Sequence, residues 1–443
     1  MLKFIKKILN NKIAVNALAS GMLKPVSMII SYIYVPIVLN YLGVEMYGAW
    51  SAILAVLSWI SYFDIGIGNG LRNKLTEAIA KKDTERCKKL ISSAYIMLAV
   101  IVAALSSIFI VVSALLDWND ILGVKEPYSE LTTVVILSIM FVSLNFVLLL
   151  CKNVLCSFQK NAFAFLLDIC AQLLNMAGVI IASCFTKGNL LIVSIIYGCS
   201  MILSCVLFSS ILYTKHRELA PSFRYFDFSI GKEVSSLGLN FFVIQISGLV
   251  LCTTDSVIIS NLYGAENVTP YSIVNKIFTA IIGVNALMLS PFQTGVTEAQ
   301  SENDIAKIKK IVHNVSILIL PFSVLAILIS VLFVPITTLW LGQELDYGIM
   351  IWLGLAYCIE YIIGNTYGVI ASGLNILKVQ MAIAIAQAIV NIPLSLLFSL
   401  FFGMGSAGIL LGTVSTMLIS TISMPAVVYS AINSYGKHRG KQL

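Results

Sequence analysis

The stretch LISSAYIMLAVIVAALSSIFIVVSALL, residues 90–116, decides the fold class. It carries no charged side chain, whereas Lys88 and Lys89 stand directly before it and Asp117 directly after it. An α-helix needs about 20 apolar residues to cross a bilayer, because each residue adds about 1.5 Å. The stretch is therefore predicted to be a membrane-spanning helix with a basic end on one side of the membrane.

Eleven further segments of this kind lie along the chain, and each is long enough for one crossing. They are residues 13–39, 47–70, 131–155, 162–185, 190–213, 237–262, 271–297, 312–338, 348–373, 379–402 and 406–430. Hydrophobic residues make up 59% of the chain and charged residues only 11%, against about 25% charged residues in soluble domains. We therefore predict an all-α integral membrane protein with twelve transmembrane helices.

The positive charges lie almost entirely on one side of this map. All but four of the 28 Lys and Arg residues belong to the chain ends and the even-numbered connections, the exceptions being Lys24, Lys125, Lys187 and Lys276. The positive-inside rule then places both termini in the cytoplasm. The net charge of +7 reports this orientation and contact with anionic lipid, not nucleic-acid binding. Residues 13–39 are too long for a signal peptide and are expected to stay as the first helix.

The residue types that form metal or redox sites are not arranged for such chemistry here. The nine cysteines include no CxxC pair and are interpreted as small packing residues. The three histidines fall at membrane edges or in the C-terminal tail. We therefore expect no metal, no cofactor and no catalytic residue, and we do not expect an enzyme.

The connection 214–236 divides the twelve segments into six and six, and the two halves echo each other weakly. Gly43 and Glu45 follow the first segment as Gly264 and Glu266 follow the seventh. The fifth and eleventh segments each hold an Ala-Gln pair, at 171–172 and 386–387. We predict an N-terminal six-helix lobe at 1–213, a cytoplasmic linker at 214–236 and a C-terminal lobe at 237–443. Parallel repeats of this kind place a transport site between the halves.

Ionisable residues inside these segments are the candidate functional residues, because a charge in hydrocarbon costs several kcal/mol unless it meets a partner or water. They are Lys24, Asp64, Asp168, Asp255, Lys276 and Glu360. Lys24 lies roughly 16 Å along its helix, too deep to reach the surface easily, and Pro25 after it favours a bend. This arrangement suits an anionic substrate in a hydrated cavity. The alternative is a structural ion pair with Asp64 or Glu360.

The other intramembrane charges admit two interpretations each. Lys276 and Asp255 lie at similar depth, so they form a structural ion pair or Lys276 is a second contact for the anion. Asp64 and Glu360 are candidate groups for proton or cation coupling, along with Asp255. Their alternatives are an ion pair of Asp64 with Arg72 or Lys24, and a neutral carboxyl at Glu360 that helps helices pack. Asp168 is close enough to its helix start to reach the interface.

The basic connection 71–89 offers one more candidate contact for the substrate. Its seven cations outnumber Glu77, Asp83 and Glu85. A segment of this kind is normally a solvated face near lipid heads. It also suits capture of a phosphorylated lipid head, so we assign Arg72, at the end of the second helix, to the substrate with Lys24 and Lys276.

Two motifs carry a family resemblance. Residues 42–50 read LGVEMYGAW and residues 64–71 read DIGIGNGL, followed by the basic connection. This combination resembles the polysaccharide or O-antigen repeat-unit flippases (Wzx type) of the multidrug/oligosaccharidyl-lipid/polysaccharide exporter superfamily. The resemblance implies two six-helix bundles in a V around a central cavity, in the bacterial inner membrane. It implies a lipid-linked oligosaccharide, carried on undecaprenyl pyrophosphate, as the substrate.

The resemblance also implies a transport mechanism and a set of partners. The diphosphate would meet cavity cations while the lipid tail stays in the bilayer, and the lobes would rock in alternating access. Expected partners are membrane lipids, a polysaccharide polymerase and a chain-length regulator, around a monomer that binds no nucleic acid. Two alternatives stay open: a cation-coupled multidrug exporter of the same superfamily, and a membrane polysaccharide polymerase.

Overall fold

The protein is helical throughout the part of the chain that the structure describes. The computed structural model describes residues 12–60, 67–125, 128–158, 160–236, 253–302, 304–374 and 376–439, and no strand occurs within them. Nine helical stretches in these ranges are long and apolar enough to cross a membrane: Leu23–Leu42, Thr84–Leu115, Leu131–Ser157, Asn161–Phe185, Leu190–Lys215, Ala265–Leu289, Ile305–Val331, Lys378–Phe401 and Gly405–Asn433. The predicted all-helical class is confirmed, and each stretch matches one predicted segment.

The three remaining predicted crossings differ in detail, so the count of twelve stays a prediction. The segment 47–70 appears as α3 (Val44–Ile60) and α4 (Ile67–Ala80), with 61–66 outside the described residues. Of the segment 237–262, only a helix at 253–263 is described. The third, α17 (Met350–Gly373), has 24 residues. It is not among the nine, and it includes a carboxylate, an asparagine and several tyrosines.

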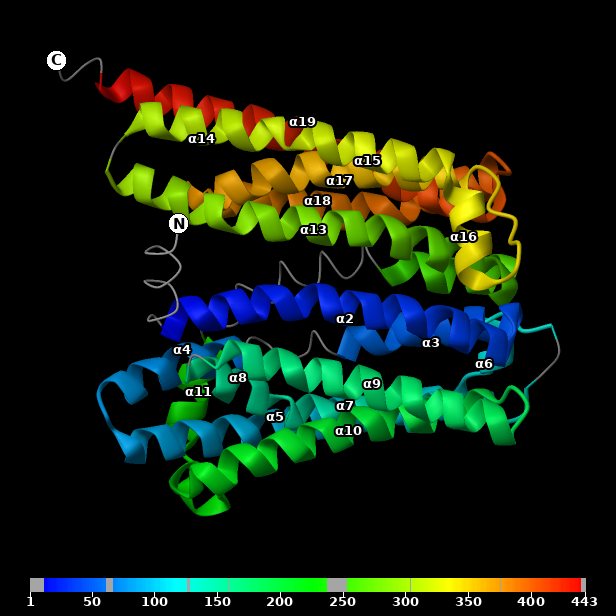
Figure 1. Ribbon diagram of the computed structural model, residues 1–443, viewed down its shortest axis with the longest axis horizontal. Helices are drawn as coiled ribbons and strands as arrows, with labels where there is room; N and C mark the ends of the chain where they lie inside the picture. The colour runs from blue at the N-terminus through cyan, green and yellow to red at the C-terminus, as the bar shows by residue number, and fades with distance from the viewer. Residues whose placement is uncertain are drawn as a thin grey trace. The chain divides into compact units, whose positions relative to one another are not determined.

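The chain divides into two compact units, unit 1 (Met1–Val243) and unit 2 (Ile244–Leu443). The long helices of unit 1 are α2 (Lys12–Leu42), α5 (Thr84–Leu115), α7 (Leu131–Leu148), α9 (Asn161–Phe185) and α10 (Leu190–Lys215). Short helices lie between or after them: α6 (Trp118–Ile121), α8 (Leu150–Ser157), η1 (Arg217–Leu219), η2 (Phe223–Tyr225) and α11 (Phe228–Ser236). α10 packs against both α7 and α9, and α9 also packs against α2 (Figure 1).

Capping residues set the starts of two of these helices. The Asp83 side chain accepts a hydrogen bond from Arg86 N, and Asn189 caps α10 through Ile192 N. Because the first backbone N–H groups of a helix lack intrahelical partners, such caps fix where it begins. The Asp83 cap carries α5 back to Thr84, six residues before the predicted start at Leu90.

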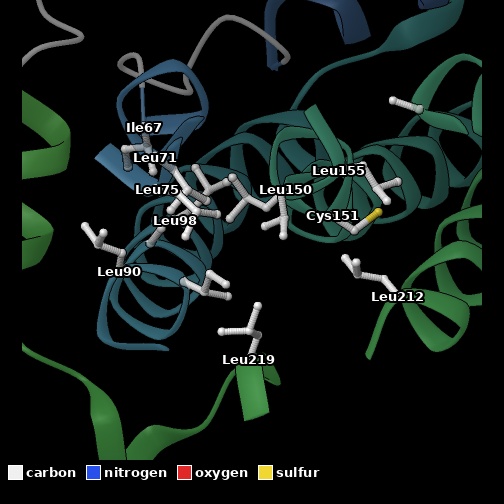
Figure 2. Close-up of a cluster of buried hydrophobic side chains, with 14 of the residues drawn as sticks. Ile67, Leu71, Leu75, Leu90, Leu98, Leu150, Cys151, Leu155, Leu212 and Leu219 are labelled. Atoms are coloured by element: carbon white, nitrogen blue, oxygen red, sulfur yellow. The ribbon is translucent and has the colours of Figure 1, made fainter. Parts of the chain in front are cut away.

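A cluster of buried apolar side chains forms the core at one end of unit 1. Figure 2 shows Leu71 and Leu75 of α4, Leu98 of α5, and Leu150 and Leu155 of α8 within it. Side chains spaced three or four residues apart share one face of a helix, so α4 turns a single apolar face toward α5 and α8. The cluster joins these short and long helices into one body.

Residues 217–236, predicted as part of a linker, pack on unit 1. The backbone N–H groups of Ser222 and Asp227 donate to the hydroxyls of Ser92 and Ser93 on α5, at 3.1 and 2.9 Å. Glu233 of α11 lies 2.6 Å from Lys74 and 3.3 Å from Arg86. These contacts tie the segment to α4 and α5, while the predicted lobe boundaries stay a prediction.

In its described residues, unit 2 contains the helix 253–263 and a set of long and short helices around α17. They are η3 (Ala265–Asn267), α13 (Val268–Ser301), α14 (Ile305–Ile317), α15 (Ile319–Val331), α16 (Phe333–Leu341), α18 (Leu377–Leu396), η4 (Leu397–Phe401) and α19 (Gly405–Arg439). α17 packs against α13, α15 and α19, and α18 packs against α19 (Figure 1). Polar residues of this unit therefore come together around α17, α18 and α19.

Candidate functional site

Lys24 lies on a polar stripe of α2. Ser27, Ser31 and Tyr34 follow it at intervals of three and four residues, which places all four on one side of the helix. Lys24 is half-buried. Within the ranges that the structure describes, no carboxylate comes within ion-pair distance of its ammonium group. The stripe was not predicted, although its spacing was readable in the sequence.

The stripe on α2 meets amide side chains of α9. Gln172 Nε2 donates to Ser27 Oγ at 2.8 Å, and Tyr34 OH donates to Asn175 Oδ1 at 3.5 Å. Hydrogen bonds between helices replace those that water would provide outside the membrane. Unit 1 therefore contains a polar seam along α2 and α9, and Lys24 stands at one end of it.

Of the other candidate charges of unit 1, Asp168 lies on α9 four residues before Gln172, on the same face of the helix. Asp168 forms an ion pair with Lys152, so the prediction that it merely reaches the interface missed its partner. Arg72 is exposed on α4, and its backbone carbonyl accepts a hydrogen bond from Ser157 Oγ at 3.2 Å. Asp64, predicted as a coupling group, lies outside the described residues.

Asp255 is the most enclosed charged residue among those described in unit 2, with 1% of its surface exposed. Its Oδ2 accepts hydrogen bonds from Thr413 Oγ1 at 2.8 Å and from Tyr271 OH at 3.2 Å. Behind Thr413, Asn391 Nδ2 donates to the same hydroxyl at 2.9 Å. Three helices, namely 253–263, α13 and α19, thus hold this carboxylate, with α18 supporting it.

The ion pair between Asp255 and Lys276, one of the two alternatives for these residues, is not formed. The partners of Asp255 are hydroxyl groups, and no ammonium group of the described chain lies within ion-pair distance of it. Lys276 is half-buried on α13, next to Asn275.

The environment of Asp255 is suited to a proton or a small cation. Asp255 Oδ1 and Asn391 Oδ1 accept no hydrogen bond from the described residues, and a buried carboxylate oxygen without a partner is costly. A cavity of about 10 Å³ lies beside Tyr271, Asn275 and Thr413. Carboxylate, hydroxyl and amide oxygens are the ligands that hard cations prefer. Protonation would equally remove the buried charge.

Glu360 stands beside a second polar region of unit 2. Its Oε2 is buried without a hydrogen-bond partner among the described residues, and its backbone carbonyl accepts from Thr421 Oγ1 at 3.2 Å. From the next residue of α17 onward, a cavity of about 210 Å³ is lined by Tyr361, Gln387 and Ser420. Gln387 Nε2 donates to Ser420 Oγ at 3.0 Å. Glu360 is thus a carboxyl close to a cavity with polar walls.

The Ala-Gln pairs noted in the sequence carry comparable roles with different partners. Gln172 of α9 bonds to α2, the first helix, whereas Gln387 of α18 bonds to α19, the last helix. Each is followed by an asparagine, Asn175 or Asn391, that bonds to a hydroxyl of the same neighbouring helix. Both units therefore place amide groups between helices.

Comparison with known proteins agrees with this helical membrane fold. The family model described as "Polysaccharide biosynthesis protein" matches residues 13–292. The "Putative O-antigen transporter" of Salmonella typhi is 22% identical over 94% of this chain and 93% of its own. An inward-facing multidrug resistance MATE family transporter of the MOP superfamily has a TM-score of 0.77 at 15% identity, covering 93% of this chain and 96% of its own.

A MOP superfamily transporter from Pyrococcus furiosus, described as having a binding pocket of reverse polarity, has a TM-score of 0.62 at 13% identity, over 95% of both chains. At these identities the structures show the fold alone, which is that of MATE transporters. With the spans described above, the relatives indicate a multi-pass membrane protein. The chain belongs to the polysaccharide biosynthesis protein family, and its resemblance to Wzx-type flippases of the multidrug/oligosaccharidyl-lipid/polysaccharide exporter superfamily is confirmed.

Proposed function

We propose that this protein moves undecaprenyl-pyrophosphate-linked oligosaccharide repeat units from the cytoplasmic to the periplasmic leaflet of the inner membrane. Family membership, which covers residues 13–292, is the observation that carries the proposal. The likeness in sequence and length to a putative O-antigen transporter supports the substrate class. The product would serve assembly of O-antigen or capsule at the cell surface.

The proposal includes an architecture and a cycle. We infer twelve crossings in two six-helix bundles, arranged as a V around a central cavity, with alternating access by rocking of the bundles. The MATE-like fold supports this arrangement. We infer a monomer that acts beside a polysaccharide polymerase and a chain-length regulator.

The physical problem is the head of the lipid, because a diphosphate with several sugars is very poorly soluble in hydrocarbon. Lys24 is proposed to be the main residue that binds the diphosphate, and Lys276 and Arg72 are proposed as further contacts. The half-buried position of Lys24, without a carboxylate partner in the described chain, supports its availability to an anion. The amides and hydroxyls of the α2–α9 seam are suited to hydrogen bonds with sugars.

Acidic groups are proposed to reset the cycle by taking up a proton or a cation. Asp255 is the leading candidate because its carboxylate retains a buried oxygen without a partner. Glu360 has the same property beside a polar cavity. Asp64 completes the set on sequence grounds alone.

The decisive experiment substitutes Lys24 in a strain that lacks its own flippase. Lys24→Ala is expected to abolish surface polysaccharide at normal protein levels, while Lys24→Arg, which keeps the charge, retains part of it. Lys309→Ala, which removes an exposed lysine of α14, is the matched control. Full activity of Lys24→Ala would remove this residue from the proposed mechanism.

The MATE-like fold leaves a multidrug exporter as the alternative. Such a carrier takes amphipathic cations and favours an acidic binding cavity, so the proposed role of Lys24 weighs against it. Sensitivity of a drug-efflux-deficient strain to cationic dyes separates the two. Resistance conferred by this protein without restoration of surface polysaccharide would favour the exporter.

A further inference from the structure

A cavity of about 440 Å³ lies in unit 1 between the start of α9 and the end of α10. Basic and imidazole side chains stand at its rim, namely Lys160, Lys215 and His216. Apolar side chains form its wall, among them Phe163, Leu166 and Ile211. Leu155 and Leu212, both labelled in Figure 2, are buried where the cavity meets the core of the unit.

Among the residues that the structure describes, the two lysines at the rim meet no counter-ion. No carboxylate of the described chain lies within ion-pair distance of Lys160 or Lys215, and the nearest ionic contact is between His216 Nδ1 and Glu218 Oε1, at 3.4 Å. Burial, and then the charge of Lys215, lower the pKa of Lys160. Two like charges close enough to repel each other would be stabilised by an anion bound between them.

An aromatic side chain holds part of this rim in place. The His216 ring stacks on Phe158, with ring centroids 5.1 Å apart, and Lys160 Nζ lies 5.7 Å from the same Phe158 ring. The two contacts bring the end of α10 and the start of α9 to one aromatic ring. Phe158 therefore links His216 and Lys160 at this rim.

Charge and apolar surface are separated along the two helices. Leu166 is about 9 Å along α9 from Lys160, and Ile211 is about 6 Å along α10 from Lys215, in the direction of the bilayer core. Both apolar side chains are open to lipid, with 39% and 45% of their surface exposed. The cationic rim belongs to connections predicted to be cytoplasmic. An amphipathic ligand with an anionic head fits this order.

We propose that this cavity binds an anionic phospholipid of the cytoplasmic leaflet, with its phosphate between Lys160 and Lys215 and an acyl chain against Leu166 and Ile211. Basic pockets between transmembrane helices on the cytoplasmic side are a recognised form of lipid-head site. The proposal is independent of the transported substrate, because its residues are separate from Lys24 and the α2–α9 seam.

The test measures lipid binding to the purified full chain by native mass spectrometry, with dioleoyl-phosphatidylglycerol against dioleoyl-phosphatidylcholine as probes. We expect the Lys160→Gln, Lys215→Gln double variant to bind phosphatidylglycerol roughly thirtyfold more weakly, equivalent to about 2 kcal/mol. The matched control is Lys309→Gln, Lys310→Gln, which removes two exposed lysines of unit 2. It is expected to bind as the unmodified protein does.

A second variant tests the apolar wall. Leu166→Trp adds bulk at a position with 39% of its surface exposed, and it is expected to weaken phosphatidylglycerol binding while both lysines remain. Equal binding of the two phospholipids, or equal loss in the two double variants, would overturn the proposal. So would glycerol 3-phosphate binding as tightly as the lipid, or preferential displacement of the phospholipid by undecaprenyl diphosphate.

Discussion

Lys24 and Asp255 show two ways of holding a charge inside a helical membrane protein. Lys24 lies half-buried on a stripe of hydroxyl groups and has no carboxylate partner in the described chain. Asp255 is enclosed by the hydroxyls of Tyr271 and Thr413 and keeps one oxygen unsatisfied. The first arrangement leaves a cation for an external anion, and the second favours uptake of a proton or small cation.

At the scale of single residues, we predict that the Asp255→Asn substitution abolishes most transport activity but leaves the protein folded. Asparagine has nearly the same shape and still accepts hydrogen bonds from Tyr271 and Thr413. We expect surface polysaccharide to fall roughly tenfold or more, because an amide neither takes up a proton nor offers charge to a cation. Complementation of a flippase-deficient strain measures the activity, and immunoblotting the protein level.

The matched control is Glu344→Gln, which neutralises an exposed acid of the same unit. It should retain full activity. If Asp255→Asn complements as well as this control, Asp255 takes no part in coupling, and Glu360 becomes the next candidate.

At the scale of elements, close contact between α18 and α19 depends on glycine. A Cβ at Gly412 would lie 2.3 Å from Ser395 Cα, and one at Gly408 would lie 2.6 Å from Ser399 Cα. These are backbone atoms that cannot move without shifting α18 or η4. Small residues allow such approach in membranes, where packing rather than hydrophobicity holds helices together.

We predict that Gly412→Ala destabilises unit 2 by about 1–3 kcal/mol, the usual effect of overpacking. Because Asn391 and Thr413 sit on these two helices, support for Asp255 should loosen as well. Thermal unfolding of the detergent-purified protein measures the change.

Gly295→Ala is the control for that experiment, because its Cβ would meet only Ile311 Cδ1, at an ordinary 3.5 Å. It should leave the melting temperature unchanged or slightly higher, since alanine favours helix. A melting temperature of Gly412→Ala equal to that of this control would refute the close-packing argument.

At the scale of the whole molecule, orientation is the property open to direct test. Alkaline phosphatase is active only outside the cytoplasm, so fusions report the side of each connection. We expect an active fusion within 117–125 and inactive fusions within 81–83 and after residue 439, because the basic connections stay in the cytoplasm. Green fluorescent protein fused after residue 439 should fluoresce. Activity of the C-terminal phosphatase fusion would contradict the predicted topology.

Much of the fold was predictable, and the discrepancies have local causes. The segment 131–155 appears as α7 and α8, separated at Leu149. Hydropathy does not reveal such a break, because both sides are apolar. The start of α5 at Thr84 depends on the Asp83 cap inside a charged connection. The family resemblance was likewise available from residues 42–50 and 64–71.

The sequence identified single candidate residues, but it did not show which of them lie together in the structure. Sequence identified Asp255 and Lys276 by their cost in hydrocarbon and left an ion pair between them as one of two alternatives. The true partner, Thr413, lies 158 residues from Asp255, and only the rotation of α19 about its axis turns it toward the carboxylate. The cavity beside Lys160 and Lys215 was also missed, because two separate connections form it.

The sequence by itself determined the helical class, most of the crossings and an expected orientation. Bilayer thickness and the charge of neighbouring connections act on each segment locally, so a linear pattern is enough to express them. Only the tertiary structure decided which hydroxyls enclose Asp255, how α2 joins α9, and where a basic rim meets an apolar wall. These depend on which face each helix turns to its neighbours, and inside a bilayer hydropathy hardly distinguishes one face from another.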